Sequence, residues 1–271
     1  MIPLFNRGVN RRQGKWALVT GASAGIGLAF AERLAVEGMN LVLTARRLDR
    51  LEQLATRLRD SRNVSVEICR ADFGEESGPA AVFEFTESKR IAVDLLVNNA
   101  GLGGYGEFRA SDLRRQLDMV QLNCAAVVQV THLYLPGMIV RGHGDIIITA
   151  SAASFQPTPY IAVYGASKAF DLMFAEALAA EVARHGVRVC ALCPGSTESE
   201  FHEIAGVPEE GRRHRVPAAP VVEAALRALD DGKTSVVPGA KDRWQINLQR
   251  LVSRRFVTRA AERVLRPPAL R

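Results

Sequence analysis

Two residues in the stretch VYGASKAF have types and spacing suited to proton transfer: Tyr164 and Lys168, four residues apart. In a helix this spacing puts both side chains on one face. A free phenol has a pKa near 10, so a tyrosine that acts as acid or base at neutral pH must become more acidic by about three units, or about 4 kcal/mol. One positive charge about 4 Å away supplies about that much at an effective dielectric constant of about 20. The pair therefore indicates acid–base catalysis.

A glycine-rich turn, TGASAGIG at 20–27, follows the first predicted strand. Gly21, Gly25 and Gly27 allow a tight turn and a close approach of a phosphate, and the helix N-terminus that follows offers N–H groups and partial positive charge. The spacing G-x-x-x-G-x-G is neither the common G-x-G-x-x-G fingerprint nor a P-loop. A plain tight turn is the alternative, but the position after a first strand favours nucleotide binding.

The end of the second predicted strand indicates which nucleotide binds. An NAD site usually has an acidic residue about 20 residues past the glycines, whereas this chain has TARR, with Ala45 in that place and Arg46 and Arg47 after it. Guanidinium groups bind a 2′-phosphate through paired hydrogen bonds, and a carboxylate repels it. We therefore predict NADP(H), with Arg46 as the main contact. The alternative is that both arginines only begin a solvated helix.

Short apolar or β-branched runs alternate with longer helical patterns along the 271 residues. Several runs are apolar throughout, as in parallel strands that are buried on both faces. We predict one domain over 1–271, an α/β fold with a Rossmann-like, doubly wound parallel sheet of about seven strands and helices on both faces. The predicted strands are 15–20, 40–45, 64–71, 93–99, 144–151, 187–193 and 234–239. The predicted helices are 25–38, 48–60, 76–90, 111–140, 160–185 and 219–231.

Several motifs in order carry a family resemblance. The glycine turn is followed by NNAG at 98–101, by Ser151 thirteen residues before Tyr164, by Y-x-x-x-K, and by Pro194–Gly195 after the sixth strand. Over about residues 14–240 the chain resembles the short-chain dehydrogenase/reductase family, and within it bacterial members related to the 3-ketoacyl-CoA and hydroxysteroid reductases. The resemblance implies an NADP(H)-dependent oxidoreductase that transfers a hydride between the nicotinamide and a ketone or secondary alcohol.

The resemblance also implies residue roles. Tyr164 would be the general acid or base, and Ser151 would polarise the substrate oxygen. Lys168 would make the phenol more acidic and bind the nicotinamide ribose, and Asn123 would hold a water that links Lys168 to solvent. Asp72 would bind the adenine, with a turn or cap role as the alternative. The predicted cofactor-binding residues are Gly21, Ser23, Gly25, Ile26, Gly27, Arg46, Arg47, Asp72, Asn99, Ala100, Gly101, Tyr164, Lys168, Pro194, Gly195 and Thr197.

The substrate is predicted from the segments around these motifs. Apolar walls are expected from Leu102, Tyr105, Phe155 and Tyr160. The long irregular stretch 196–220 predicts a loop that covers the substrate and excludes water. Such walls favour a hydrophobic carbonyl or alcohol, and a fatty acyl derivative, a steroid-like compound and a terpenoid all stay open.

The charge of the chain is uneven. Residues 241–271 hold nine Lys or Arg against two Asp or Glu, a local +7, so the other 240 residues sum to −1. The pattern of this C-terminal extension predicts two short amphipathic helices with a break near 254–256. They would pack on the domain or on a neighbouring subunit, or contact an anionic membrane surface. Nucleic acid is not an expected partner, because the basic residues lack interleaved aromatics and a recognised motif.

The remaining features concern the cellular location of the protein and its cysteines. We see no apolar run of about 18–20 residues and no signal-peptide pattern, so a cytoplasmic location is expected, with peripheral membrane contact through the extension as an addition. Cys190 and Cys193 lie three apart on a predicted strand and would point to opposite faces, so they cannot easily share a disulfide or a metal and are expected to be buried small residues. No metal site is expected.

Two expectations concern how the protein works as a whole. By the family resemblance, a homo-oligomer would form through the helices at 111–140 and 160–185. The alternative to an enzyme is an NADP(H)-binding redox sensor with little turnover. A sensor needs the cofactor site but not the proton-transfer residues, so the set Ser151, Tyr164 and Lys168 argues against it.

Overall fold

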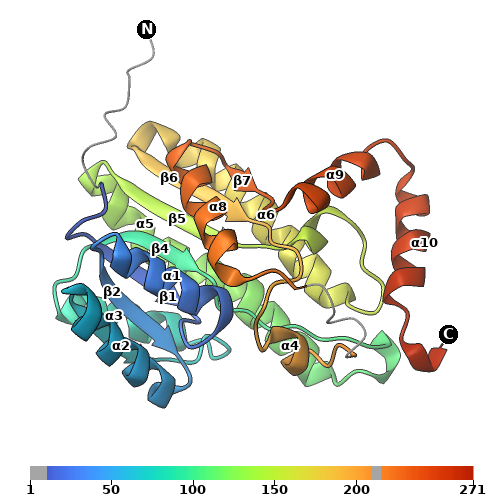
Figure 1. Ribbon diagram of the computed structural model, residues 1–271, viewed down its shortest axis with the longest axis horizontal. Helices are drawn as coiled ribbons and strands as arrows, with labels where there is room; N and C mark the ends of the chain where they lie inside the picture. Colours follow the sequence, from blue (N-terminus) through green and yellow to red (C-terminus); the bar gives the residue numbers. More distant parts are fainter. Residues whose placement is uncertain (1–10, 209–214, 271) are drawn as a thin grey trace, which may run out of the picture.

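A parallel sheet of seven strands, ordered β3-β2-β1-β4-β5-β6-β7, forms the centre of the computed structural model, which describes residues 11–208 and 215–270 (Figure 1). The predicted fold class is therefore confirmed. The order reverses between β1 and β4, where a ligand cleft is expected at the carboxyl ends of the strands. The strands are β1 (Trp16–Thr20), β2 (Asn40–Ala45), β3 (Val66–Arg70), β4 (Val93–Asn98), β5 (Gly144–Thr149), β6 (Val187–Leu192) and β7 (Ser235–Val236).

Helices connect the strands and cover both faces of the sheet (Figure 1). The α-helices are α1 (Gly25–Val36), α2 (Leu48–Arg62), α3 (Gly78–Ser88), α4 (Leu113–Val120), α5 (Ala126–Arg141), α6 (Ala162–Val182), α7 (Phe201–Ile204), α8 (Ala218–Asp230), α9 (Ala240–Gln249) and α10 (Arg254–Leu265). The short turns are the 3₁₀ segments η1 (Phe108–Ala110), η3 (Ala152–Phe155), η4 (Ala183–His185) and η6 (Pro268–Leu270), and the π-turn η2 (Gln121–Ala125).

Successive side chains along each strand point to opposite faces of the sheet, so a hydrophobic core forms on each face. In β4, Leu95 and Val97 pack with α1, α2 and α8, whereas Leu96 packs with α3, α5 and α6. Cys190 and Cys193 follow the same rule and lie in different cores, and all four cysteines are free. The expectation that these two thiols are buried and unpaired is confirmed.

The helix predicted at 111–140 is interrupted by the π-turn η2, which carries Asn123. By length and composition alone, Leu113–Arg141 could cross a membrane, with a mean hydropathy of 1.3 over its best window. The expectation that no apolar stretch reaches that length was therefore too strict. Its α5 part packs against β4, β5 and α3, and 39% of that window is buried inside the fold.

The segments predicted near the C-terminus differ from the structure in detail. The stretch 196–220 contains α7 and a bridge between Thr197 and Val216, and its residues 209–214 lie outside the described residues. The extension forms two helices as predicted, but the break falls at 250–253 rather than 254–256. Ser253 causes the shift, because its side chain accepts a hydrogen bond from Phe256 N and caps α10.

Candidate active site

A cavity of about 670 Å³ lies at the carboxyl ends of the strands, where the strand order reverses. The glycine turn after β1, the ends of β2, β4 and β5, the start of α6 and the loop after β6 line it. Parallel strands end at one edge of a sheet, so motifs far apart in the sequence meet there. Of the predicted catalytic and cofactor-binding residues, all line this cavity except Asn123 and Gly27.

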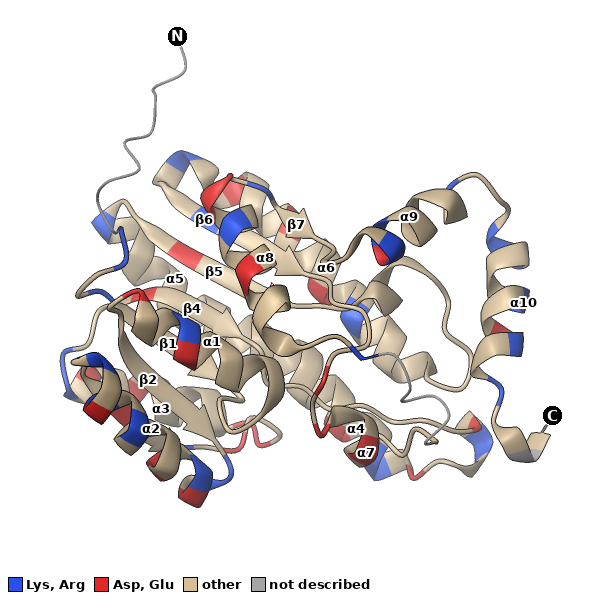
Figure 2. Cartoon of the chain, in the orientation of Figure 1, with Lys and Arg blue, Asp and Glu red and all other residues tan. Residues whose placement is uncertain are grey.

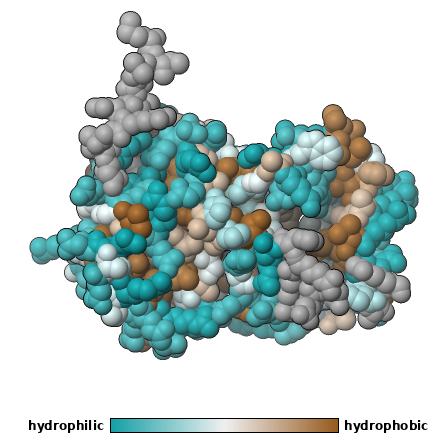
Figure 3. All heavy atoms as spheres, in the orientation of Figure 1, coloured by the Kyte–Doolittle hydropathy of each residue, from teal (hydrophilic) through white to brown (hydrophobic). Residues whose placement is uncertain are grey.

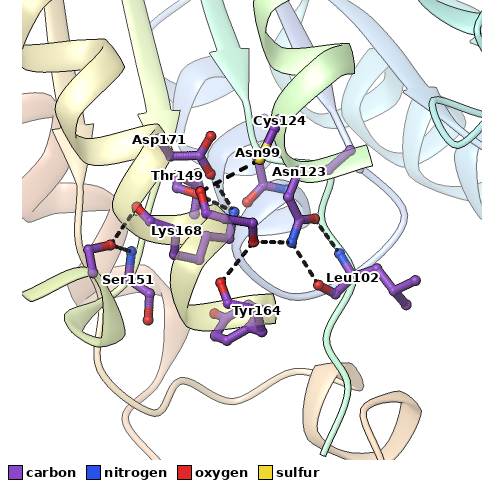
Figure 4. A network of polar contacts seen from close by, with 12 residues as sticks. Asn99, Leu102, Asn123, Cys124, Thr149, Ser151, Tyr164, Lys168 and Asp171 are labelled. Carbon is purple, nitrogen blue, oxygen red and sulfur yellow. Dashed lines mark hydrogen bonds and ion pairs between the residues drawn. The ribbon is translucent and has the colours of Figure 1, made fainter. Parts of the chain in front are cut away.

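The three predicted proton-transfer residues come from two neighbouring segments (Figure 4). Ser151 follows β5, and its Oγ accepts a hydrogen bond from Ala153 N at 3.1 Å, which begins η3. Tyr164 lies in the first turn of α6, and its ring packs on that of Phe201 with centroids 5.1 Å apart. Small residues in this turn permit close packing, since a Cβ at Gly165 would lie 1.9 Å from Thr158 Oγ1.

Lys168 lies one turn further along α6 and is 4% exposed. Its Nζ donates to the carbonyl oxygen of Thr149 at 2.7 Å and to Asp171 Oδ2 at 2.9 Å. Burial by itself lowers the pKa of Lys168, but the charge of Asp171 and then the phenol of Tyr164 raise it above the ordinary value. The amine therefore carries its positive charge at neutral pH, as its predicted role requires.

Asn123 lies beside the cavity rather than in its lining. Its Oδ1 accepts from Leu102 N at 2.9 Å, and its Nδ2 donates to Leu102 O and to Ser167 Oγ, each at 2.9 Å. The amide thus ties the segment after NNAG to α6. The predicted water link to Lys168 stays a prediction.

The glycine turn fits a phosphate. Gly21 and Gly25 have φ of +67° and +55°, which favour glycine. A Cβ at Gly25 would lie 2.7 Å from Ser199 Cβ on the opposite wall, and no side chain caps the N-terminus of α1. Gly27 does not line the cavity, and its predicted role in binding the cofactor stays a prediction. A Cβ there would come 2.3 Å from Gly21 O, so this glycine permits the packing of the turn on itself.

The two arginines after β2 both line the cavity but differ in how firmly they are held. Arg46 has a 67% exposed side chain, 3.8 Å from Asp72. Arg47 donates to Ser23 Oγ at 3.0 Å and pairs with Glu200 at 2.5 Å. Asp72 lines the cavity and also accepts from Gly74 N at 2.9 Å, so the turn role and the predicted adenine contact are compatible.

The four residues predicted as substrate walls lie in different places. Leu102 and Tyr105 line the cavity. Phe155 instead packs against the core beneath α6, because η3 turns its ring inward. Tyr160, at φ +65°, donates its hydroxyl to Glu262 of α10 at 2.9 Å, outside the residues that line the cavity. Both predictions are corrected.

Sequence reasoning missed other walls. Phe201 and His202 of α7 line the cavity, as do Val264, Leu265 and Pro268 of the extension. Tyr105 fixes that end of the extension by donating its hydroxyl to Leu265 O at 2.9 Å. At the other end, a Cβ at Gly195 would lie 2.3 Å from Asp242 of α9. The expectation that the extension packs on the domain holds for these parts, and no periodicity in the sequence indicated the contacts.

Comparison with known proteins agrees with this geometry. The profile of the family described as short chain dehydrogenase matches residues 15–206. A very-long-chain 3-oxoacyl-CoA reductase of Anas platyrhynchos is 35% identical over 198 residues, which are 71% of this chain and 62% of that protein. This chain thus spans less than two thirds of that relative.

Two solved structures extend the comparison to the fold. A short-chain dehydrogenase from Sphingobium yanoikuyae in complex with NADPH is 33% identical, with a TM-score of 0.79 over 88% of this chain and 94% of that one. A bulky-bulky ketone specific alcohol dehydrogenase from Comamonas testosteroni is 30% identical, with a TM-score of 0.75 over 88% and 92%. With the cavity geometry and the profile match, these likenesses show that the chain is an oxidoreductase of the short-chain dehydrogenase family.

Proposed function

We propose that this protein is an NADPH-dependent reductase of bulky, hydrophobic ketones. One observation carries the proposal: Ser151, Tyr164 and Lys168 line the same cavity as the glycine turn and the arginines after β2. The NADPH complex of the Sphingobium relative supports the choice of cofactor. A redox sensor would have no need of the three proton-transfer residues.

In the proposed reaction each residue has one task. The reduced nicotinamide, when bound, would supply the hydride that the carbonyl carbon accepts. Ser151 donates a hydrogen bond to the carbonyl oxygen and so polarises it. Tyr164 gives that oxygen its proton, and the charge of Lys168 stabilises the phenolate that remains. Phe201, which packs on the Tyr164 ring, excludes water from this end of the cavity.

The walls support a bulky substrate. The cavity lining includes the apolar side chains of Leu102, Ile204, Val264 and Leu265. The Comamonas relative acts on ketones that are bulky on both sides, and the Anas relative on an acyl thioester. We infer a ketone flanked by two large apolar groups, with long-chain 3-oxoacyl thioesters as the second class.

A substrate series tests the function. We expect the purified protein to oxidise NADPH with ring ketones and aryl ketones at kcat/KM values at least about 100-fold above those for acetone, because each buried methylene adds about 0.8 kcal/mol. The measurement is the decrease in NADPH absorbance with ring ketones, aryl ketones, 3-oxoacyl thioesters and short ketones. Tight NADPH binding without turnover on any of them would contradict the proposal and favour the sensor.

The extension gives a second test of the substrate site. Deleting residues 254–271 removes Val264, Leu265 and Pro268 from the cavity wall. We expect KM for the best ketone to rise about tenfold or more, since apolar contacts are lost, while the dissociation constant for NADPH stays within about twofold. Steady-state kinetics and fluorescence titration measure these quantities. An unchanged KM would mean that the extension does not bound the substrate.

The other partners stay predictions. Exposed apolar residues on α4 and α6, among them Leu117, Phe170 and Met173, would be covered if a second copy packs there as expected. On α9, α10 and the turn between them, Trp244, Leu251 and Phe256 are exposed, in a segment that also carries several arginines (Figures 2 and 3). Exposed apolar and basic residues together suit the predicted contact with an anionic membrane.

A further inference from the structure

The buried carboxylate of Asp171 forms an ion pair with Lys168. Asp171 lies three residues after Lys168 on α6 and is 0% exposed. Its Oδ2 accepts from Lys168 Nζ at 2.9 Å, and its Oδ1 has no hydrogen-bond partner among the described residues. A buried carboxylate with half of its acceptor capacity unused is costly, so its presence in an otherwise apolar core needs a reason.

The contacts of the ammonium group show what Asp171 does for the position of Lys168. A lysine ammonium has three N–H donors. One goes to Thr149 O at 2.7 Å and one to Asp171 at 2.9 Å, both on fixed elements. Nζ also lies near the cavity surface, since a Cβ at Gly101 would be 3.5 Å from it. Two anchored donors leave the third to face the cavity.

The charges around Asp171 are few. Lys168 is its ion-pair partner, and the nearby titratable groups from other segments are the thiols of Cys124 in η2 and Cys193 after β6. Burial, helped by the charge of Asp171, raises the pKa of Cys124 to about 11, and burial also raises the pKa of Cys193. Both thiols are neutral at physiological pH. The buried pair is therefore electrically balanced, and Figure 4 shows the nitrogen of Lys168 beside Asp171 and Thr149.

This arrangement bears on the proton of Tyr164. A lone ammonium beside a phenol favours the phenolate, and a carboxylate behind that ammonium opposes the effect. Carbonyl reduction needs the phenol with its proton. We propose that Asp171 is a positioning residue that fixes the ammonium of Lys168 and offsets its charge, which favours the protonated form of Tyr164 that carbonyl reduction needs. The inference rests on the proposed function and adds the direction in which the site is suited to work.

The test removes the negative charge of Asp171 and keeps the size and shape of its side chain. In Asp171→Asn the amide oxygen can still accept a hydrogen bond from Lys168 Nζ. Lys168 also keeps its hydrogen bond to Thr149 O and its access to the cavity, so its ammonium group stays charged. We expect Tyr164 to lose its proton at a pH lower by roughly one unit. The measurement is phenolate absorbance against pH, taken as the difference between each protein and the same protein with Tyr164→Phe, without turnover. The pH above which kcat for ketone reduction declines should fall by the same amount.

Matched variants make the result specific. Glu176→Gln removes a charge from the same helix, where Glu176 accepts from Ser235 Oγ, and is expected to leave the titration unchanged. An unchanged or alkaline-shifted titration in Asp171→Asn overturns the inference. If wild-type protein reduces no ketone, the proposed function fails, but the absorbance titration still decides the role of Asp171.

Stability gives an independent readout if Asp171→Asn folds poorly. Lys168→Met leaves the Asp171 carboxylate buried without a counter-charge, so its melting temperature should fall by several degrees. Adding Asp171→Asn to Lys168→Met should restore most of that loss, because no buried charge remains. A double variant no more stable than Lys168→Met would show that the two residues are not coupled, and would overturn the inference.

Discussion

Replacing Tyr164 with phenylalanine is expected to lower kcat for ketone reduction by about 1,000-fold, within the range that a positioned general acid contributes. The variant loses one hydroxyl and keeps the ring that packs on Phe201 at 5.1 Å. The cavity and the glycine turn should therefore be unchanged, and the dissociation constant for NADPH should stay within about twofold. Single-turnover kinetics at saturating NADPH measures the chemical step directly.

The chain offers a matched control for this experiment. Tyr160, four residues earlier, directs its hydroxyl to Glu262 of α10 rather than into the cavity. Tyr160→Phe should therefore keep kcat within about threefold of the wild type, since it deletes the same atom outside the site. Near-normal turnover in Tyr164→Phe, or an equal loss in both variants, would show that Tyr164 is not the acid.

The parts that could be predicted from sequence are those fixed by local patterns. Apolar runs predicted the seven strands because strands buried on both faces have little other choice of residue. Tyr164 and Lys168 could be placed on one face because the i,i+4 spacing is a property of the helix itself. The glycine turn followed from the conformational freedom of glycine at Gly21 and Gly25.

What could not be predicted depends on contacts between distant segments. Phe155 and Tyr160 read equally well as cavity walls, and only the turn of η3 and the position of α10 direct them elsewhere. Asp171 belongs to no motif that the sequence analysis used, and it is the packing of α6 on the sheet that buries it. A charged residue three positions after the lysine, inside an otherwise apolar helical face, was the available signal.

The cofactor end of the site leads to the second large effect. Arg46→Ala with Arg47→Ala should weaken NADPH binding by at least about 100-fold, because two charge-assisted contacts to a phosphate are each worth about 1.5–3 kcal/mol. Binding of NADH, which lacks that phosphate, should change by no more than about twofold. The single variants decide whether Arg46, as predicted, or the better-anchored Arg47 contributes more. Fluorescence titration with both nucleotides measures the ratio.

A substitution at Glu200 should strengthen NADPH binding, the opposite of the effect expected for the arginine variants. Its carboxylate pairs with Arg47 at 2.5 Å and with Arg50 at 2.6 Å, and hydrogen bonds from these arginines lower the pKa of Glu200, so it stays charged at neutral pH. Glu200 and Arg47 both line the cavity, so a bound 2′-phosphate would compete with this carboxylate for the same guanidinium. Glu200→Gln should therefore tighten NADPH binding severalfold and leave NADH binding unchanged.

A control variant separates competition at Arg47 from a general change in charge. Arg50 shares Glu200 but does not line the cavity, so Arg50→Ala should alter NADPH binding far less than Arg47→Ala. High salt should reduce the NADPH preference of the wild type, since the contacts to a phosphate are ionic. If Glu200→Gln weakened NADPH binding, or if Arg47→Ala and Arg50→Ala each affected NADH and NADPH equally, Arg47 and Arg50 would serve only to hold Glu200 at the start of α7. The nucleotide preference would then have to come from another wall of the cavity.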